Sequence, residues 1–482
     1  MSDVSVAGLC RALERAGVAH PDSVNPIKPT FVCAVSGGLD SMVLLHLLVS
    51  AGYAVRAIHI DHAAHSDSSS WASWVRGQVE ALGVTLSVHR LSGLSNNGNL
   101  EESWRNARRE LFQQECGDET LVTAHHKDDQ AETLLLQLLR GAGVAGLQAM
   151  PLSQTLPSGT RHVRPLLNHT RAELQVYAEN QRIEWIEDPS NQNEHFDRNF
   201  LRGSVLPLIR ERWPGAVKAI ARSSELIGEA ADLNAVLAAQ DARFSDGDTG
   251  LDWSALEPLG LVRQANAVRF WLSRLGCRYP SRRRLTEALR QWNEAMCDRV
   301  PVLELKEGTV QRYRNRLVFV RGVGDVPDDW SAQLALGEWI ALPGALGELG
   351  LTQSNKDRND PQSICGPQLQ TSPTDLSRQN PGVQMLGRGG LALAGELATQ
   401  RLTVRFRQNG ERLRRASGQH QSLKHWFQGN DVPPILRSRL PLVFLGDELI
   451  AIANQWIDSR YRPAAEDGAQ IFCQLVWRSN DP

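Results

Sequence analysis

The chain has 482 residues, of which 41% are hydrophobic and 22% are charged, and its formal net charge is −2. This length exceeds the roughly 250–300 residues at which single hydrophobic cores stop growing, so we expect several domains. No apolar run approaches the roughly 18 residues that cross a bilayer, so no transmembrane helix is predicted.

Residues 30–141 alternate short, β-branched apolar runs with helical patterns. Strands are predicted at 30–36, 53–60, 84–91 and 119–126, and helices at 39–50, 69–83, 101–115 and 129–141. Such an alternation predicts an α/β fold with a parallel, doubly wound, Rossmann-like sheet. Ligands of these sheets bind beyond the carboxyl ends of the strands, where the loops after Ser36, Ile60 and Ala124 converge.

The rest of the chain predicts three further parts. Residues 1–215 form the first domain, which ends at a Trp-Pro-Gly break, and 216–325 form a mostly helical middle domain with a small hairpin. Residues 326–395 are expected to be a connection with a flexible polar insertion near 353–382. A small α+β domain is expected over 396–482.

Charge and cysteine usage bear on partners and compartment. Residues 401–440 contain nine Arg and Lys residues and two acidic residues, so this segment is locally strongly basic. The seven cysteines are scattered, without a CxxC pair, which is typical of reduced thiols. Since no secretory signal is visible, we expect a cytoplasmic protein without a membrane partner.

The SGGLDS sequence at 36–41 follows the first predicted strand and opens the first predicted helix. Two glycines let the backbone approach an anion, and the helix N-terminus supplies amide donors and positive potential. The loop lacks the lysine of GxxxxGK[ST] and differs from GxGxxG, so γ-phosphate hydrolysis and hydride transfer are disfavoured. A Gly-Gly pair that only turns the chain is the alternative. The predicted nucleotide-binding residues are Ser36, Gly37, Gly38, Leu39, Asp40 and Ser41.

Asp40 stands at the start of this helix as a carboxylate beside the predicted polyphosphate site. Two negative groups repel each other unless a cation lies between them, so Mg²⁺ shared by Asp40 and phosphate oxygens is the natural expectation. Capping of the helix is the simpler role, and the two are compatible.

The sequence HHKDDQAET at 125–133 places two histidines and several carboxylates at a strand end and helix start. This is more polarity than capping needs, although Asp128 as a cap and Glu132 on a solvent face would account for part of it. A zinc site is the rival interpretation, but adjacent histidines point apart and no cysteine accompanies them.

These motifs resemble a known family. SGGLDS after VCAV is similar to the loop of the ATP-pyrophosphatase, or PP-loop, enzymes, which bind ATP and release AMP and pyrophosphate. The tRNA(Ile)-lysidine synthases resemble this chain almost throughout. The motifs that carry the resemblance are SGGLDS, HIDHAAHSDSS (59–69), EESWRNAR (101–108), HHKDDQAET, RPLL (164–167), WIEDPSN with RNFLR (185–202), YPSRRRLTEA (279–288) and RFRQNGERLRR with the segment after it.

The resemblance implies a ligase that uses ATP and Mg²⁺ to join free L-lysine to C2 of the wobble cytidine of a tRNA(Ile) with a CAU anticodon. It also adds His62 to the nucleotide-binding residues. Adenylation of the base needs cations near the phosphates, for which we expect Arg105 and Arg108; a solvated, salt-bridged helix face is the alternative. Attack by lysine needs a proton acceptor, for which Asp129 is the first candidate and Asp128 the second.

tRNA recognition is expected to combine phosphate contacts with an unstacked anticodon base. The predicted RNA-binding residues are Arg198, Arg202, Arg412, Arg414, Arg415 and Lys424. Trp426 and Phe427 either stack on bases or form the core of the small domain, and the core is favoured.

Two other functions stay open from the sequence. One is another PP-loop enzyme that thiolates tRNA or amidates a small molecule, although Cys33, the one cysteine near the loop, lies on a strand and should be inert. The other is a non-catalytic, nucleotide-sensing RNA-binding protein. The oligomeric state is left open, with a homodimer among the forms compatible with the sequence.

Overall fold

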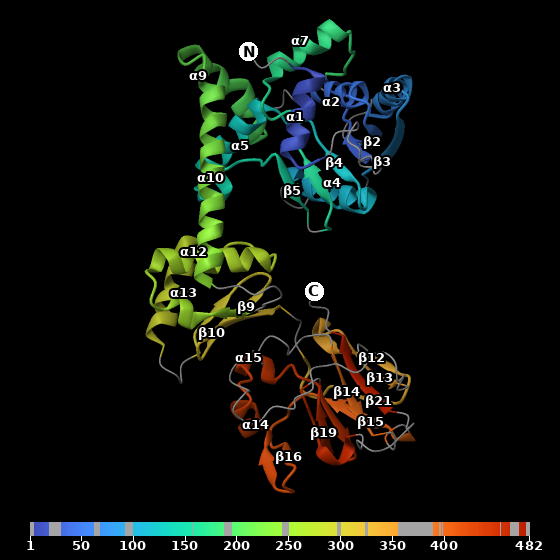
Figure 1. The fold of residues 1–482 in the computed structure, drawn as a ribbon, viewed down its shortest axis with the longest axis vertical. Coiled ribbons are helices and arrows are strands. Elements are labelled where there is room, and N and C mark those ends of the chain that lie inside the picture. The colour runs from blue at the N-terminus through green and yellow to red at the C-terminus, as the bar shows by residue number, and fades with distance from the viewer. Residues whose placement is uncertain are drawn as a thin grey trace. The chain divides into compact units, whose positions relative to one another are not determined.

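The computed structural model describes fourteen stretches of the chain and divides it into two compact units, Met1–Leu233 and Asn234–Pro482 (Figure 1). The described residues are 4–18, 30–61, 68–91, 100–156, 158–187, 195–242, 250–295, 300–322, 326–354, 389–394, 397, 399–453, 455–462 and 472–478. No helix in these stretches has both the length and the apolar character needed to cross a membrane.

The first unit contains a six-stranded sheet in the order β3-β2-β1-β4-β6-β5. Its strands are β1 (Thr30–Ala34), β2 (Ala54–Asp61), β3 (Thr85–Arg90), β4 (Thr120–Val122), β5 (Ser153–Thr155) and β6 (Arg161–Val163). All neighbours pair in parallel except β5, which is antiparallel to β6. The predicted parallel, doubly wound sheet is confirmed.

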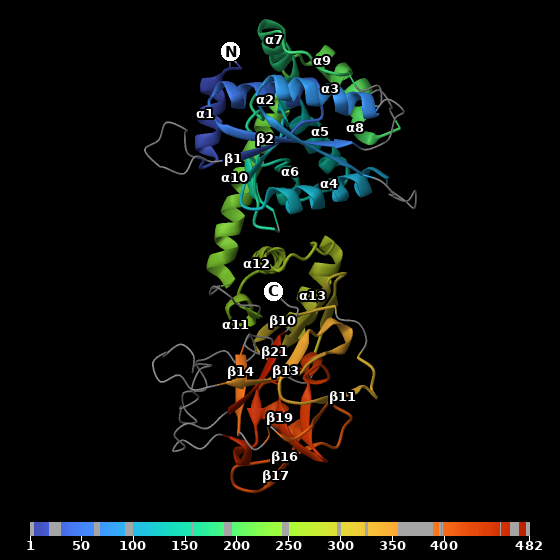
Figure 2. The ribbon, with the colours of Figure 1, turned by 90° about the vertical axis from the view of Figure 1, so that its right-hand side faces the viewer.

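Helices cover both faces of this sheet because successive side chains of a strand point to opposite sides. Phe31 and Cys33 of β1 join one apolar core with helices α1, α2, α3 and α7, whereas Val32 joins a second core with Phe112 and Cys116 of α4. Figure 2 shows α2 and α3 on one side of the sheet and α4 on the other. The bounds are α1 (Val6–Arg15), α2 (Leu39–Ser50), α3 (Ser68–Ala81), α4 (Leu100–Cys116), α5 (Lys127–Leu139), α6 (Val144–Leu147) and α7 (Arg171–Gln181).

The segment after the sheet is helical but interrupted. It runs through α8 (Asp197–Phe200), a π-helical turn (Leu201–Val205) and α9 (Leu206–Arg212), and the long helix α10 (Ala216–Ala242) follows. The break at Trp213-Pro214-Gly215 lies where the sequence predicts it. π-helical turns often occur at functional sites, and this turn includes Arg202.

The second unit begins with a helical part that packs on a small sheet. Helices α11 (Trp253–Leu256), α12 (Leu261–Arg274) and α13 (Arg282–Glu294) share a core with strands β7 (Gly250–Asp252), β8 (Val302–Glu304), β9 (Gly308–Tyr313) and β10 (Arg316–Arg321). The sheet order is β7-β10-β9-β8. Trp253, Trp271 and Trp292 are fully buried in this core. The predicted hairpin is thus part of a four-stranded sheet.

The C-terminal part of this unit is rich in strands. One sheet has the order β11-β15-β18-β19-β20, a second has the order β12-β13-β21-β14, and β16 pairs with β17. The bounds are β11 (Ser331–Leu334), β12 (Trp339–Ala341), β13 (Glu348–Ser354), β14 (Gly389–Leu393), β15 (Leu402–Arg405), β16 (Arg412–Arg414), β17 (His420–Ser422), α14 (Leu423–Gly429), α15 (Pro434–Arg437), β18 (Leu442–Leu445), β19 (Glu448–Ile452), β20 (Trp456–Ile457) and β21 (Phe472–Arg478).

Part of the predicted connection over 326–395 differs from expectation. Strand β11 pairs with β15, and β13 pairs with β21 over seven residues, so 331–354 belong to the sheets of the C-terminal part. The physical reason is apolar alternation, since Leu349 and Leu351 point into its core. Most of the predicted insertion near 353–382 lies outside the described residues.

Candidate active site

The SGGLDS loop joins β1 to α2 and is closed by its own side chains. The Ser41 hydroxyl donates to the carbonyl of Gly38 (2.9 Å) and accepts from the backbone N–H of Ser36 (3.2 Å). Gly37 has φ +88°, and a Cβ there would lie 2.7 Å from Cγ2 of Val75, so both its conformation and its surroundings require glycine. The loop is therefore held in shape without any ligand.

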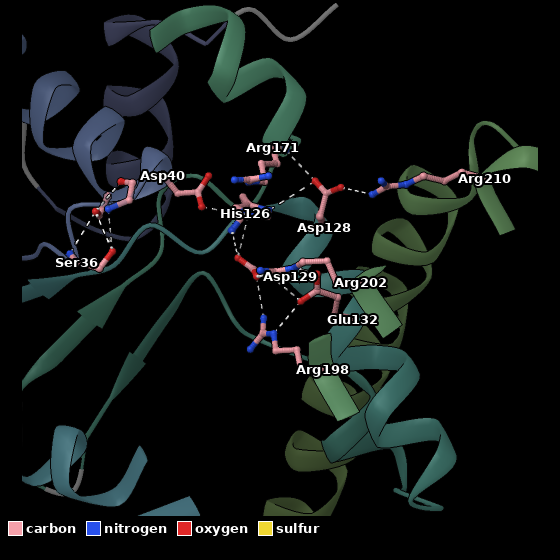
Figure 3. Close-up of polar contacts among 12 residues, drawn as sticks. Ser36, Asp40, His126, Asp128, Asp129, Glu132, Arg171, Arg198, Arg202 and Arg210 are labelled. Atoms are coloured by element: carbon pink, nitrogen blue, oxygen red, sulfur yellow. Dashed lines mark hydrogen bonds and ion pairs between the residues drawn. The ribbon is translucent and has the colours of Figure 1, made fainter. Parts of the chain in front are cut away.

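Asp40 follows this loop in the first turn of α2 and faces the start of α5 (Figure 3). Its Oδ2 lies 3.6 Å from Nε2 of His126. Its Oδ1 is buried without a hydrogen-bond partner among the described residues. A buried carboxylate oxygen without a donor is costly unless a cation or another ligand meets it, so the site fits Mg²⁺, which binds through one or two carboxylates and substrate phosphates.

The start of α5 is organised around the imidazole of His126, which is 2% exposed. Besides Asp40, His126 contacts Asp128 (Nδ1 to Oδ2, 3.5 Å) and Asp129 (Nε2 to Oδ2, 3.4 Å). Burial alone would lower the pKa of His126, but the three carboxylates outweigh it and raise the pKa to about 10. His126 is therefore an imidazolium at neutral pH.

Asp129 and Glu132 lie side by side on the buried face of α5 and bind two arginines from the segment after the sheet. Glu132, 1% exposed, accepts from Nε of both Arg198 and Arg202 at 2.7 Å. Asp129 accepts from Nη2 of Arg198 at 2.8 Å and of Arg202 at 3.1 Å. We call these four residues the carboxylate–guanidinium cluster. Since Arg202 lies in the π-helical turn, the cluster fixes that turn against α5.

Asp129 also closes the N-terminus of α5, because its Oδ2 accepts from the backbone N–H of His126 (3.0 Å). Burial would raise its pKa, but His126 and the guanidinium of Arg198 hold it well below its usual range. The pKa of Asp128 is also lowered, since its own burial is outweighed by His126 and by the backbone N–H of Arg171 (2.8 Å), with Arg210 as an ion-pair partner. Both carboxyl groups are ionised at neutral pH.

His125 takes no part in these contacts. Its Nδ1 lies 2.8 Å from the Thr123 hydroxyl, which lies 2.8 Å from Nε2 of His162 on β6. Burial, followed by nearby charges that include Arg164 and Arg108, lowers the pKa of both histidines to about 3. The two adjacent histidines thus differ in charge and direction, as the sequence predicts for their direction.

Two comparisons with known proteins agree. A PP-loop domain model matches residues 20–209, a TilS substrate binding domain model matches 251–318, and a TilS substrate C-terminal domain model matches 402–477. The tRNA(Ile)-lysidine synthase of Pseudomonas aeruginosa is 37% identical, covering 93% of this chain and 94% of that relative. Those of Pseudomonas putida and Methylococcus capsulatus are 36% and 35% identical, covering 93% and 94% of this chain and 96% of each relative.

The chain belongs to the tRNA(Ile)-lysidine synthase family. The resemblance inferred from the sequence motifs is confirmed, and the PP-loop domain model includes both the SGGLDS loop and the carboxylate–guanidinium cluster. The site described above is therefore the PP-loop site of a member of this family.

The structure brings together some residues predicted from the sequence and separates others. Asp40, Asp128 and Asp129 meet at His126, and the charge of Arg108 on α4 acts on His125. The side chain of Arg105, one turn earlier on α4, and all of His62 lie outside what the structure describes.

The structure adds tertiary contacts to residues interpreted from the sequence. The guanidiniums of Arg198 and Arg202 are held by Asp129 and Glu132, and the RNA binding predicted for both arginines stays a prediction. The cap of α5 comes from Asp129 and not from Asp128, and Glu132 is buried and not on a solvent face. Tertiary pairing between segments about 70 residues apart decides these roles, which local sequence pattern does not report.

Several residues of the site carry no predicted role. Thr123 follows β4 within the strand predicted at 119–126, whereas His162 and Arg164 lie on or beside β6, where the sequence predicts no strand. The RHVRPLL sequence at 161–167 was the available signal, since it places polar residues in a short apolar run before a turn.

The first prediction concerns acid stability. His162 is neutral when folded but takes a proton below about pH 6.5 when unfolded, so the unfolded state binds more protons and stability falls as pH falls toward the folded pKa of about 3. In urea titrations of the full chain between about pH 4.5 and 6.5, we expect His162→Gln to reduce the pH slope of the unfolding free energy, by about 1.4 kcal/mol per pH unit at the acidic end and about half of that at pH 6.5. A slope equal to that of the wild type would contradict a neutral buried His162.

The second prediction concerns the carboxylate–guanidinium cluster. Glu132→Gln keeps the shape of the side chain but leaves Arg198 and Arg202 with one carboxylate less. Both arginines are about one-third exposed, so the loss should be smaller than for a fully buried pair. We expect the free energy of unfolding to fall by on the order of 2 kcal/mol. Glu225→Gln on the exposed side of α10 is the matched control and should change it by under about 0.5 kcal/mol. Equal effects of the two substitutions would show that the cluster adds nothing to stability.

Proposed function

We propose that this chain ligates L-lysine to C2 of the wobble cytidine of tRNA(Ile) with a CAU anticodon, through an adenylated tRNA, and releases AMP and pyrophosphate. The product, lysidine, pairs with A, so the codon read changes from AUG to AUA. The observation that carries this proposal is family membership over 93% of the chain together with a preformed PP-loop next to a carboxylate whose Oδ1 has no partner among the described residues.

The first step activates the base, because the C2 oxygen of cytidine is a poor leaving group. This oxygen attacks the α-phosphorus of ATP, and the bond from that phosphorus to pyrophosphate breaks. The loop supports the step with backbone amides at Gly37 and Gly38, and with hydroxyls at Ser36 and Ser41 that already form a hydrogen-bonded pair at 3.2 Å. Leu39, 3% exposed, anchors the start of α2 in the core.

Mg²⁺ is the cation that the free Oδ1 of Asp40 suits, and it would supply charge neutralisation for the phosphates. His126 lies on the other side of this carboxylate and holds Oδ2. Further positive charge is available from Arg108, and we assign Arg105 of the same helix to this role as well.

The second step is attack of the lysine ε-amine on C2, with cleavage of the C2–O bond and departure of AMP. An amine with a pKa near 10.4 arrives as an ammonium and must lose a proton. Asp129 and Asp128 have lowered pKa values, which makes them weak proton acceptors. We therefore assign these two carboxylates to attracting and orienting the ammonium, in place of the proton-accepting role predicted from the sequence for Asp129 and, as second candidate, Asp128. The amine then gives up its proton to solvent water as it attacks C2.

tRNA binding is assigned in part to the β16–β17 hairpin and the start of α14. Arg412, Arg415 and Lys424 are exposed there, while Arg414 is half-buried. Phe427 is fully buried and Trp426 packs against the same core, so the core role favoured from the sequence holds for Phe427. Arg405, by contrast, pairs with Glu411 and stacks on Phe444.

Thiolation is the less favoured function. Cys33 is fully buried on β1, and burial raises the pKa of its thiol far above the usual range, so a reactive thiolate does not form there.

The function is tested by incubating the full chain with an unmodified CAU-anticodon tRNA, ATP, Mg²⁺ and radiolabelled lysine. We expect AMP release that requires both tRNA and lysine, and a lysine-labelled nucleoside in the digested tRNA by mass spectrometry. AMP release without incorporation of lysine into the tRNA would contradict the proposal.

The third prediction concerns Asp40. Asp40→Asn keeps the shape but removes the charge that suits Mg²⁺, so we expect AMP formation to fall on the order of 100-fold or more while the tRNA dissociation constant changes little. Asp118→Asn, at an exposed turn before β4, is the control. Near-normal turnover of Asp40→Asn at saturating Mg²⁺ would refute the cation role.

The fourth prediction concerns the basic hairpin. Each phosphate contact adds roughly 0.7–0.9 to the slope of log affinity against log salt. A triple substitution of Arg412, Arg415 and Lys424 to Ala should therefore weaken tRNA binding and flatten this slope by about 2, with ATP binding unchanged. If the slope and activity stay the same, these cations are only a solvated face.

A further inference from the structure

A chain of hydrogen bonds runs from Arg164 through His162 and Thr123 to His125. The Nη2 atom of Arg164 lies 3.2 Å from Nδ1 of His162, and the Thr123 hydroxyl lies 2.8 Å from both Nε2 of His162 and Nδ1 of His125. Arg164, His162 and Thr123 are buried, and a second bond from Arg164 Nη1 to the carbonyl of Pro151 (2.9 Å) fixes the guanidinium. The mechanism above uses none of these four residues.

The chemistry of the groups sets the direction of the bonds from Arg164 through His162 to Thr123. A guanidinium has only donors, so Nδ1 of His162 must accept, and a neutral His162 then carries its proton on Nε2. That N–H donates to the Thr123 oxygen, so the hydroxyl hydrogen of Thr123 can donate to Nδ1 of His125. With this arrangement a neutral His125 carries its proton on Nε2.

The charges around the two rings agree with their neutral state. His125 is surrounded by Asp129, which favours protonation, and by Arg164, Arg198 and Arg108, which oppose it together with burial. Protonation of His162 is opposed by burial and by the nearby charges of Arg164, His125, Arg108 and Arg109. The side chain of Gln154 on β5 also lies 3.3 Å from Nδ1 of His162 through its amide nitrogen, a second donor to the same atom.

We infer that Thr123, His162 and Arg164 are positioning residues that hold His125 as the Nε2–H tautomer, so that His125 donates a hydrogen bond to a substrate oxygen and does not act as a proton acceptor. Within the described part of the chain the bond at Nδ1 is the only hydrogen bond of the His125 ring, and Nε2 is not among the buried polar atoms that lack a partner. The donor is thus free for a ligand.

This inference rests on the proposed function for the identity of the ligand. Two substrates of that reaction present oxygen acceptors near a PP-loop: the phosphates of ATP and the C2 carbonyl of cytidine. The tautomer itself depends on the protein alone and can be tested without any substrate, so a failure of the inference and a failure of the proposed function are distinguishable.

The test is long-range ¹H–¹⁵N NMR of ¹⁵N-histidine-labelled full chain at neutral pH, with His125 and His162 assigned by His125→Asn and His162→Asn. We expect both rings neutral and protonated on Nε2. In Thr123→Val the donor to Nδ1 of His125 is lost and a mixture of tautomers should appear, whereas Thr123→Ser should keep the wild-type signals. A protonated or Nδ1–H His125 in the wild type would overturn the inference.

Two ligand arms distinguish the sources of the oxygen. A non-hydrolysable α,β-methylene ATP analogue and, separately, an anticodon stem-loop RNA are added to the labelled protein. A shift of the His125 Nε2 signal with the analogue assigns the donor to phosphate, and a shift only with the RNA assigns it to the base. No shift with either probe would overturn the donor role.

Kinetics separate positioning from general damage to the fold. Thr123→Val should lower kcat/KM for adenylation about 10-fold, as losses of supporting hydrogen bonds do, and Thr123→Ser should restore it. Thr85→Val, an exposed threonine on β3, controls for the substitution itself. Equal activity of Thr123→Val and Thr123→Ser, with one unchanged tautomer, would show that Thr123 only packs.

Discussion

The geometry of the site depends on two buried carboxylates of α5 that share two arginines. Glu132 is almost fully buried, and a carboxylate at such a position is tolerated only when cations and hydrogen bonds meet its oxygens. Arg198 and Arg202 do so, and they arrive from a helical segment about 70 residues later that includes a π-helical turn. This cluster attaches that segment to the sheet domain and fixes the first turn of α5, where Asp129 and His126 face the nucleotide loop.

In this arrangement the charged groups of the site have different partners. Asp129 pairs with Arg198 and Arg202, Asp128 pairs with Arg210, and His126, whose pKa these carboxylates raise, lies between them and Asp40. Asp40 alone among these acids keeps a buried oxygen without a donor in the described structure, which makes it the carboxylate suited to a cation. In the proposed function, the acids on α5 attract the incoming amine, whereas the acid on α2 serves the phosphates.

The local sequence pattern was sufficient to predict the strands and helices of the PP-loop domain, but it was insufficient to predict the ion pairs between them. The helix predicted over 39–50 has the same bounds as α2, because a run that is apolar all round between a Gly-Gly turn and a glycine stop has few alternatives. The pairing of Arg198 and Arg202 with α5 was missed, since arginine near a domain border is usually exposed and only the tertiary fold brings the carboxylates to it. His126 likewise looked equivalent to His125 in sequence, yet one is a cation and the other neutral.

The central chemical claim is that this site activates the tRNA base and not the amino acid. It is tested most directly by incubating the full chain with [α-³²P]ATP, Mg²⁺ and CAU-anticodon tRNA in the absence of lysine. The account predicts ³²P on the tRNA, which added lysine then releases as AMP. Label that never appears on the tRNA, or that appears on lysine as an aminoacyl adenylate, would contradict it.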